Sequence, residues 1–463
     1  MAASLATNPG VRSAIGLLEA WLDSQLAYRG WPGLSIGILH DQELIWARGF
    51  GQASLERAEA ATPDTLYRIA SITKLFTSTA IMQLRDAGKL RLDDRLTDHL
   101  GWFKIGQSHP DAPPITIEHL LTHTAGLPRE LGFPYWTDSN FPTAEDARRR
   151  LPEQSTALPT ETSWKYSNLG LALAGEVVAT VAGQPFDQYV SERVLKPLGM
   201  ARTFVTTPPK DAPGLATGYT RRLPTGARTE TPFTDGRWIT PAANMTTSVT
   251  DLARFAMLQF RDGAAGGAQI LRGSTLREMH RPHWVEPDWV AGWGLGFRLM
   301  REGGRTLVGH GGRLRGYRTQ LQLCPAERIG VIVMINAEDG EPLVIASRFF
   351  EWVAPAIARA TAPPTKDGLP AGWERYVGKY RSPGADTQVL VLDGALVLID
   401  PSVPNPTLGI TRLRPVAEHT FRMETTEGYA SNGELVVFEL NAAGRVCRVK
   451  IGENYTEPVP DWK

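Results

Sequence analysis

The sequence has very little cysteine, with only Cys324 and Cys447 among its 463 residues. Two cysteines exclude a disulfide-built scaffold and a cysteine-based zinc site. The chain also has no excess of charge, since 49 Lys and Arg balance 49 Asp and Glu. A general nucleic-acid binder would need a strong basic excess, so we expect no nucleic-acid partner. The apolar fraction of 42% and the charged fraction of 21% are usual for a globular protein and exclude dominant disorder.

Long apolar runs are missing as well. The longest uncharged apolar stretch, residues 329–337, has the length of a strand and not of a membrane helix, which needs about 18 residues or more. Residues 1–10 lack the basic and apolar segments of a secretory signal. We therefore expect a cytoplasmic protein with no membrane partner. The sequence leaves the oligomeric state open.

Patterns typical of strands occur near both ends of the first 360 residues. Residues 34–50 read as two apolar runs around Asp41-Gln42, which predicts a β-hairpin. Residues 90–250 are mainly helical with Pro-rich loops, and strand patterns return from residue 294. Residues 341–360 then predict one more helix. This order favours an α/β sheet domain, residues 1–362, that is split by a helical insertion at about 90–250.

The remainder of the chain has a different composition. Residues 361–372, TAPPTKDGLPAG, are typical of a linker. Residues 373–463 contain short alternating apolar runs. They predict a separate small all-β domain.

The first candidate for chemistry is Ser71-Ile72-Thr73-Lys74, at the start of a predicted helix, 71–88, that is apolar on nearly every side. Residues i and i+3 share a helical face, so the Lys74 amine can reach the Ser71 hydroxyl. A serine in the first turn also lies at the positive end of the helix dipole. The alternative is a helix cap with a surface lysine, which an all-apolar helix argues against.

The second candidate is Tyr166-Ser167-Asn168, directly before a predicted helix at 169–181. A tyrosine hydroxyl near a lysine can share a proton with it, and an asparagine amide can hold both a lysine and a substrate oxygen. The alternative is that Tyr166 packs and Asn168 caps the helix.

The third candidate is His310-Gly311-Gly312, which follows a strand predicted at 305–308. Small residues at a strand edge let a substrate approach closely. The backbone N–H of Arg313 is then a candidate oxyanion donor. The alternative is a glycine-rich hairpin turn.

Together and in this order, the three motifs resemble the serine β-lactamase and penicillin-binding-protein family. The flanking segments LLTHTAGLP (120–128) and WKYSNLG (164–170) are similar to its class C-like branch, which includes esterases and D-aminopeptidases. The resemblance covers residues 12–360. It implies an antiparallel sheet domain beside a helical domain. Residues 373–463 resemble the small lipocalin-like barrels that follow some members.

The resemblance also implies an acyl-enzyme mechanism without a metal or a cofactor. Ser71 attacks a carbonyl carbon, and Lys74 and Tyr166 jointly accept and return the proton. Free lysine and tyrosine have pKa values of about 10.4 and 10, so one of the two must have its pKa lowered to act as a base at neutral pH. The resemblance assigns substrate positioning to Asn168, His310, Gly311 and Gly312, and the oxyanion hole to the N–H groups of Ser71 and Arg313.

The third motif departs from the family pattern, because β-lactamases typically have Lys-Thr-Gly where this chain has His310 and two glycines. This argues against a dedicated β-lactamase and is similar to the D-aminopeptidase branch. Arg313, Arg315 and Arg318 beyond it either bind an acidic group or lie on the surface. We expect a carboxylesterase-like serine hydrolase for small esters. The alternatives are a D-aminopeptidase, an amidase or weak β-lactamase at the same site, and a non-catalytic binding protein.

Other patterns suggest sites that we discount. Ser35 lies in a Gly-x-Ser-x-Gly sequence, but inside a predicted strand and not at a strand-to-helix turn. His119 and His123 have the spacing of metal ligands without an evident third ligand. Four tryptophans are expected to line an apolar acyl pocket: Trp136, Trp164, Trp238 and Trp293.

Overall fold

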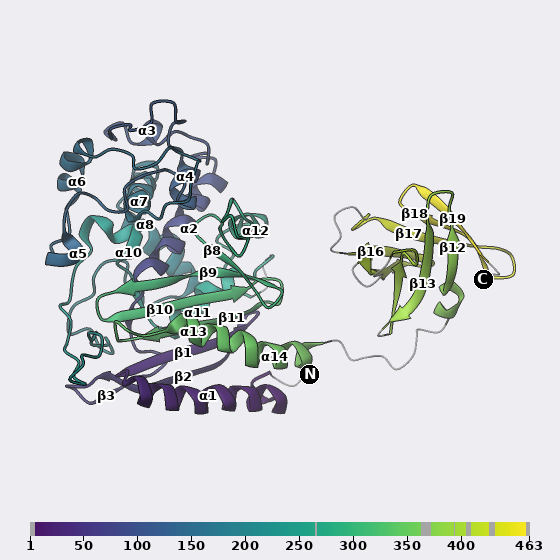
Figure 1. The fold of residues 1–463 in the computed structure, drawn as a ribbon, viewed down its shortest axis with the longest axis horizontal. Helices are drawn as coiled ribbons and strands as arrows, with labels where there is room; N and C mark the ends of the chain where they lie inside the picture. Colours follow the sequence, from purple (N-terminus) through teal and green to yellow (C-terminus); the bar gives the residue numbers. More distant parts are fainter. Residues whose placement is uncertain are drawn as a thin grey trace. The chain divides into compact units, whose positions relative to one another are not determined.

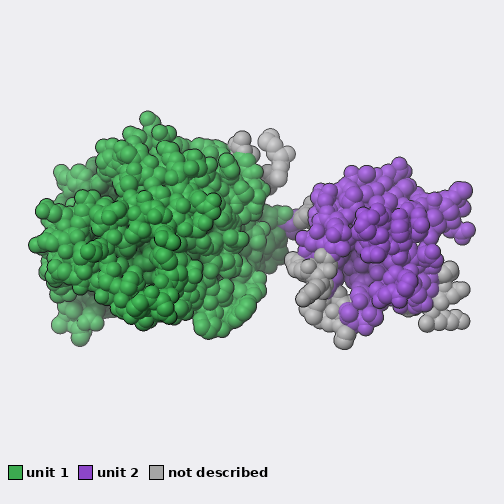
Figure 2. Space-filling model, turned by 90° about the horizontal axis from the view of Figure 1, so that it is seen from above, with its two compact units in different colours: residues 1–361 green, residues 362–463 purple. Residues whose placement is uncertain are grey.

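The chain forms two compact units in a computed structural model, residues 1–361 and residues 362–463 (Figure 2). Most of the predicted linker, residues 363–371, lies outside the described residues. The structure describes residues 5–263, 266–362, 372–392, 394–403, 409–425 and 431–459.

The first unit is built on a nine-stranded antiparallel sheet with strand order β3-β2-β1-β11-β10-β9-β8-β7-β6 (Figure 1). The predicted hairpin is β1 and β2, and β1 also pairs with β11, so the first and last strands of the sheet in sequence lie side by side. The strands are β1 (Gly33–His40), β2 (Glu43–Ser54), β3 (Glu59–Ala60), β6 (Trp284–Val285), β7 (Ala291–Trp293), β8 (Arg298–Glu302), β9 (Arg305–Leu314), β10 (Tyr317–Cys324) and β11 (Ile329–Ile335).

Helices cover both faces of this sheet. Strand β11 is buried along its whole length, with Val331 and Val333 in one apolar cluster and Ile332 and Met334 in the other. The first cluster also contains side chains of α1 (Pro9–Arg29), α13 (Pro342–Arg348) and α14 (Ala354–Thr361). A π-helical segment, Phe349–Val353, separates α13 from α14, whereas we expected one continuous helix there.

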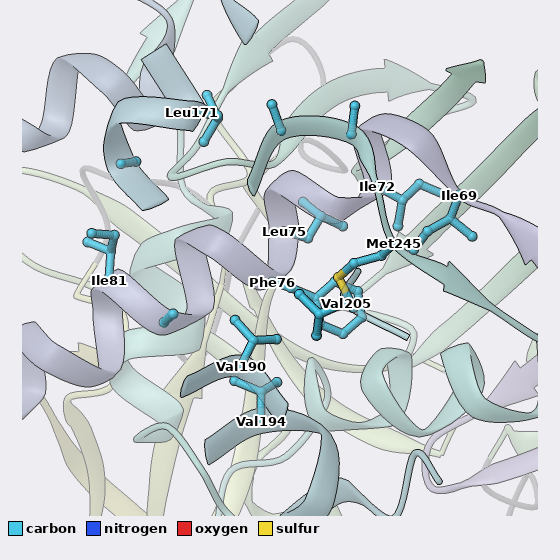
Figure 3. Close-up of a cluster of buried hydrophobic side chains, with 14 of the residues drawn as sticks. Ile69, Ile72, Leu75, Phe76, Ile81, Leu171, Val190, Val194, Val205 and Met245 are labelled. Atoms are coloured by element: carbon cyan, nitrogen blue, oxygen red, sulfur yellow. The ribbon is translucent and has the colours of Figure 1, made fainter. Parts of the chain in front are cut away.

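The second face packs against the predicted helical region. Its centre is α2 (Thr73–Asp86), whose side chains are buried on nearly all sides, as its apolar sequence predicts. Figure 3 shows Leu75 and Phe76 of α2 among apolar side chains from several elements, and the Phe76 ring stacks on Phe255 at 4.1 Å. The helices of this region are α3 (Leu96–His99), α4 (Ile117–Thr122), α5 (Tyr135–Asp138), α6 (Ala144–Arg150), α7 (Asn168–Ala182), α8 (Phe186–Val190), α9 (Lys196–Leu198), α10 (Thr240–Ala243), α11 (Val249–Leu258) and α12 (Gly273–His280).

A small two-stranded sheet leads into α2. Strand β4 (Tyr67–Arg68) pairs with β5 (Thr246–Thr247), and three residues later the chain reaches Ser71. This ladder ties the segment before α2 to a distant part of the chain.

The second unit is a closed barrel of eight strands with its own apolar core, which includes Tyr380, Phe421 and Phe438. Small barrels of this size are filled by side chains. The strands are β12 (Gly378–Arg381), β13 (Asp386–Leu392), β14 (Ala395–Ile399), β15 (Thr411–Ala417), β16 (Thr420–Glu424), β17 (Leu435–Leu440), β18 (Val446–Ile451) and β19 (Asn454–Pro458). The expected fold class, an antiparallel sheet with helices followed by a β-barrel, is confirmed.

Within the described part of the chain, no single helix has the length and apolar character needed to cross a membrane. One pair of helices, Asn168–Ala182 and Phe186–Leu198, meets the requirement together but bends by 79°. Most of the residues of α7 are buried in the core of the first unit.

Candidate active site

Ser71 lies at a sharp turn that brings its side chain to the wall of a large cavity. It is the middle residue of a short 3₁₀ helix, Ala70–Ile72, directly before α2, and Ala70 has a φ of +46°. A non-glycine residue with a positive φ persists only when its surroundings hold it there. Here the Ile69 N–H donates to Met245 O at 2.9 Å, and the Thr319 hydroxyl donates to Ile69 O at 3.2 Å.

The three predicted catalytic residues meet at the Ser71 hydroxyl. The Tyr166 hydroxyl lies 2.8 Å from Ser71 Oγ, and Lys74 Nζ lies 3.1 Å from it. The tyrosine comes from the turn before α7, about 95 residues away along the chain, so the fold and not the sequence spacing creates this contact.

Lys74 is completely buried, and its amine has three oxygen neighbours. Besides Ser71, Nζ donates to Asn168 Oδ1 and to Ala242 O, each at 2.7 Å. Burial lowers the pKa of Lys74 well below its ordinary value; Glu130 partly opposes this and Arg129 adds to it. Burial therefore favours the neutral amine form of Lys74 over the charged form.

The geometry fixes where the lone pair of that neutral amine points. An amide oxygen and a backbone carbonyl oxygen can only accept hydrogen bonds. They take the two N–H groups of neutral Lys74, so the lone pair is left for the third neighbour, the Ser71 hydroxyl. This is the arrangement that a general base needs.

The pKa of Tyr166 is shifted in the opposite direction to that of Lys74. Burial raises its pKa far above the ordinary value, although the Ser71 hydrogen bond and the nearby Arg129 act the other way. Tyr166 therefore keeps its proton at neutral pH and can give it only in exchange for another. Of the two groups for which the sequence left the assignment open, Lys74 has the lowered pKa.

Glu130 belongs to the same network, and our sequence reasoning did not identify it. Its Oε1 accepts from Asn168 Nδ2 at 2.6 Å, and its Oε2 accepts from the Tyr135 hydroxyl. A carboxylate can only accept, so the Asn168 nitrogen turns toward Glu130 and the Asn168 oxygen toward Lys74. The only sequence signal is that Glu130 directly follows the LLTHTAGLP segment and Arg129.

His310, Gly311 and Gly312 lie inside strand β9, which continues to Leu314. The expected end of the strand at residue 308 is wrong, and so is the alternative of a glycine turn. The glycine is required by close packing and not by a turn: a Cβ on Gly312 would lie 2.2 Å from Ile69 O and 2.1 Å from Thr319 Oγ1. Strand β9 can therefore pass the Ser71 segment only with glycine at this position.

The third motif lines the same cavity as Ser71, Tyr166 and Asn168. This cavity has a volume of about 1490 Å³. His310 Nδ1 lies 2.7 Å from Gly311 O, which places the ring proton on Nδ1. Burial lowers the His310 pKa to about 3, so the imidazole is neutral. Arg313 is also in the cavity wall; its role and that of Ser71 as oxyanion donors remain predictions.

The cavity wall has no dominant charge. Among the described residues it contains five arginines and five acidic residues. Arg313, Arg315 and Arg318 all contribute to it, and Arg315 is held by the Ser139 hydroxyl and by two backbone carbonyls of α5. Burial lowers the pKa of Arg318 to about 10. The arginines thus face the cavity, but acidic residues balance them.

Three of the four expected tryptophans line this cavity: Trp136, Trp164 and Trp293. The Trp164 and Trp293 rings stack at 5.1 Å. The expectation for Trp238 is wrong, because it is absent from the cavity wall and its indole N–H donates to Glu176 at 2.9 Å. The cavity wall therefore contains one tryptophan fewer than expected.

The discounted patterns have structural roles. Ser35 is fully buried, and its hydroxyl donates to Thr62 O at 2.7 Å. His119 Nδ1 accepts from the Thr116 N–H, and its Nε2 lies 2.7 Å from Glu161. The His123 ring packs against Tyr166 at 4.4 Å. Nowhere in the described residues do three or more His, Cys, Asp or Glu side chains gather as a metal ion would require.

An antiparallel sheet, a buried helix with Ser-x-x-Lys at its start and a glycine-containing strand beside it define the β-lactamase and transpeptidase-like fold. The chain belongs to the beta-lactamase family, whose model matches residues 18–354. A curated relative, "Beta-lactamase-like protein 2" of Dictyostelium discoideum, is 29% identical over 333 residues, which are 70% of this chain and 60% of that protein. The chain thus spans about three fifths of the length of the curated relatives it matches.

Solved structures agree with the fold. The octameric penicillin-binding protein homologue from Pyrococcus abyssi has a TM-score of 0.64 and 25% identity, covering 96% of this chain and 99% of its own. A D-stereospecific amidohydrolase from Streptomyces sp. has a TM-score of 0.60 and 22% identity over 72% of this chain and 97% of its own. EstCE1, a hydrolase with promiscuous acyltransferase activity, has a TM-score of 0.62 and 21% identity over 76% of this chain and 100% of its own. At these identities the last two show the fold alone.

Proposed function

We propose that this protein is a serine hydrolase that cleaves small carboxylic esters through an acyl-enzyme on Ser71. One observation supports this most strongly: Ser71 Oγ lies within hydrogen-bond distance of both Lys74 Nζ and Tyr166 Oη, at the wall of a cavity large enough for a substrate. A nucleophile in hydrogen-bond contact with both a base and a proton donor provides the parts that acyl transfer requires.

Acylation follows from these contacts. The Lys74 lone pair takes the proton of the Ser71 hydroxyl as Oγ bonds to the ester carbonyl carbon. The carbonyl electrons move to oxygen, where the N–H groups of Ser71 and Arg313 are the proposed donors, each worth about 3 kcal/mol of transition-state stabilisation.

The tetrahedral intermediate then collapses. The bond from carbon to the leaving oxygen breaks, and that oxygen takes a proton from Tyr166, which receives one in turn from protonated Lys74. Water repeats the sequence on the acyl-enzyme: the base removes its proton, its oxygen bonds to the carbonyl carbon, and Ser71 leaves as a hydroxyl. The products are an alcohol and a carboxylic acid, with no metal or cofactor in any step.

The cavity favours a neutral substrate. Its acidic and basic residues balance, and Trp164 and Trp293 offer apolar surface close to the reacting residues. Neutral His310 stands where β-lactamases of the family typically have a lysine, so no cation is available there for the carboxylate of a β-lactam. Esters are also intrinsically easier to cleave than amides.

A second candidate, hydrolysis of D-amino acid amides or peptides, has one observation in its favour. An aminopeptidase needs an anion to hold the substrate ammonium group, and the cavity wall contains Glu130, Glu286 and Asp288. Glu130 is already bonded to Asn168 and Tyr135, however, so we rank this activity second.

The test is a paired measurement of kcat/KM for p-nitrophenyl butyrate and D-alanyl p-nitroanilide, with Ser71→Ala as the control. The proposal predicts a strong preference for the ester and no turnover by the variant. Comparable rates on the anilide would favour the amidase. Failure of both substrates, or an equally active variant, would contradict the proposal.

A further inference from the structure

A second cavity, of about 390 Å³, lies in the first unit and shares no lining residue with the catalytic cavity. Strand β4 forms part of its wall through Arg68, and Tyr317 at the start of β10 forms another part. The remaining wall comes from two loop segments, residues 215–218 and residues 230–233, and from Arg57 and Lys210. Small-molecule sites in proteins have volumes of about 300 to 1000 Å³, so the size is sufficient for a ligand.

Arg68 is the unusual residue in this wall. It is 2% exposed, yet no acidic side chain of the described residues lies within ion-pair distance of it. Its terminal nitrogens donate to Thr234 and to Asn244 Oδ1 at 2.6 Å, which are neutral acceptors. Its Nε–H is buried and has no acceptor in the described part of the chain. Asp235 acts on Arg68 only from beyond ion-pair distance and offsets only part of the cost of burying it. A buried charge without a contacting counter-charge is costly, so an anion at this place would be stabilising.

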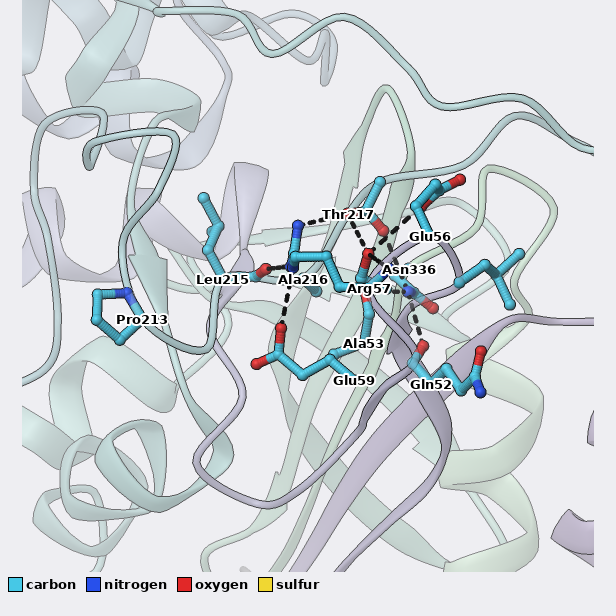
Figure 4. A network of polar contacts seen from close by, with 12 residues as sticks. Gln52, Ala53, Glu56, Arg57, Glu59, Pro213, Leu215, Ala216, Thr217 and Asn336 are labelled. Atoms are coloured by element: carbon cyan, nitrogen blue, oxygen red, sulfur yellow. Dashed lines mark hydrogen bonds and ion pairs between the residues drawn. The ribbon is translucent and has the colours of Figure 1, made fainter.

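The other charges of the wall are mostly positive. Arg57 and Lys210 accompany Arg68, and Glu230 is the one acidic residue among the described lining residues. Figure 4 shows that Arg57 is already engaged: it donates to Leu215 O at 2.8 Å and to Glu59 at 3.1 Å. The cations available to a ligand are therefore Arg68 and Lys210.

The loop that forms this wall is held firmly by polar contacts. The Asn336 side chain donates to Thr217 O, Gln52 O and Ala53 O, each at 3.1 Å, and Arg57 Nη1 donates to Thr217 Oγ1 at 3.3 Å (Figure 4). The cavity is therefore preformed on this side, which lowers the cost of ordering a bound ligand.

The cavity also has an apolar part. Leu215, Pro232 and Phe233 line it, and the Arg68 guanidinium lies over the Phe233 ring at 5.1 Å. An inorganic ion alone would leave this surface without a contact. This combination of cationic and apolar lining residues suits an organic molecule with an anionic head and a compact apolar or aromatic body.

We propose that this cavity binds a small organic oxyanion, a phosphate monoester or a carboxylate, with its head at Arg68 and Lys210. The phosphate and the carboxylate share the chemistry that arginine recognises, a set of acceptor oxygens with negative charge. The site is separate from the proposed esterase chemistry and does not depend on it.

The test is isothermal titration calorimetry of the full chain with phenyl phosphate, benzoate and inorganic phosphate at constant ionic strength. One equivalent of phenyl phosphate or benzoate should bind, more tightly than inorganic phosphate because the ring contacts the apolar wall. The tighter of the two organic ligands identifies the head group. No measurable binding of either organic anion would overturn the proposal.

Two variants locate the site. Lys210→Ala removes an exposed cation of this cavity and should weaken binding about tenfold, the loss of one charge-assisted hydrogen bond. Arg315→Ala removes a cation of the catalytic cavity instead and should leave the affinity unchanged. Equal affinity for Lys210→Ala and the wild type would overturn the proposal, and a loss confined to Arg315→Ala would overturn it by placing the anion in the catalytic cavity. Lys104→Ala, at an exposed lysine outside both cavity walls, is the matched control.

Discussion

The Asn168 side chain donates to Glu130 Oε1 at 2.6 Å and so presents its oxygen to the buried amine of Lys74. This one contact decides which end of the amide faces the proposed base. With Ala242 O as the other fixed acceptor, it directs the Lys74 lone pair to Ser71. Glu130 is thus a positioning residue, because in this structure it acts through Asn168.

Replacing Glu130 tests this positioning directly. Glu130→Gln lets the Asn168 amide adopt either orientation, because a glutamine amide can both donate and accept. We expect kcat/KM for p-nitrophenyl butyrate to fall roughly 10- to 100-fold, the cost of one charge-assisted hydrogen bond. Glu145→Gln, at an exposed acid of α6, should have no effect. Equal activity of the two variants would contradict the positioning role.

The pH dependence of kcat/KM should show which residue is the base. Burial lowers the Lys74 pKa, and only the neutral amine is active, so kcat/KM should rise with pH through that pKa and then level off. The Tyr166 pKa is raised, so no decline from loss of its proton should appear below about pH 10.

The same pH profile should also show the direction in which replacing Glu130 shifts the Lys74 pKa. Its negative charge raises the Lys74 pKa, so in Glu130→Gln the acidic limb of the profile should move to lower pH. A limb that stays in place, or that moves to higher pH, would mean that Lys74 does not produce it.

Gly312 should be irreplaceable for a steric reason. Gly312→Ala places a Cβ against Ile69 O and Thr319 Oγ1, so strand β9 or the segment before Ser71 must shift. We expect a loss of about 1 to 3 kcal/mol in the free energy of unfolding, together with reduced activity. Gly101→Ala is the control, because a Cβ there meets nothing within 4 Å. Denaturant unfolding of both variants checks this, and equal stability would refute the packing argument.

Acid should destabilise the first unit through its buried histidines. The His310 pKa is lowered to about 3, whereas an unfolded histidine has a pKa of about 6.5. Between these values the unfolded chain binds more protons, so stability falls as pH falls from 6.5 toward 3. At pH 5 this one residue should cost about 2 kcal/mol relative to pH 7. His310→Asn should reduce the pH dependence of the unfolding free energy by that amount; a parallel dependence would contradict the assignment.

The catalytic motifs were predictable because each has a local signature. Ser71 and Lys74 share a helical face, and Lys74 in an all-apolar helix already indicates burial. The decision between Lys74 and Tyr166 was not predictable, since it depends mainly on how deeply the fold buries each group, and to a smaller extent on Arg129 and Glu130, which reach the site from another loop. Glu130 itself is a single acid with no spacing pattern, and only the fold brings it to Asn168.

The wrong prediction that strand β9 ends at residue 308 has a physical explanation. Glycine is unfavourable in strands, so Gly309, Gly311 and Gly312 suggest the end of a strand. In the structure the strand continues because glycine is what close packing requires: a Cβ on Gly309 would lie 2.0 Å from Leu321 O. The Trp238 error has another cause: no motif adjoins Trp238 in sequence, and only the fold decides which tryptophans face the cavity.

The most direct test of the account is the identity of the acylated residue. The protein is quenched during turnover of p-nitrophenyl butyrate, digested and analysed by mass spectrometry, with Ser71→Ala and Ser35→Ala in parallel. The account predicts one butyryl group on the peptide that contains Ser71, its absence in Ser71→Ala and its retention in Ser35→Ala. A butyryl group on the Ser35 peptide, or labelling that persists in Ser71→Ala, would contradict it.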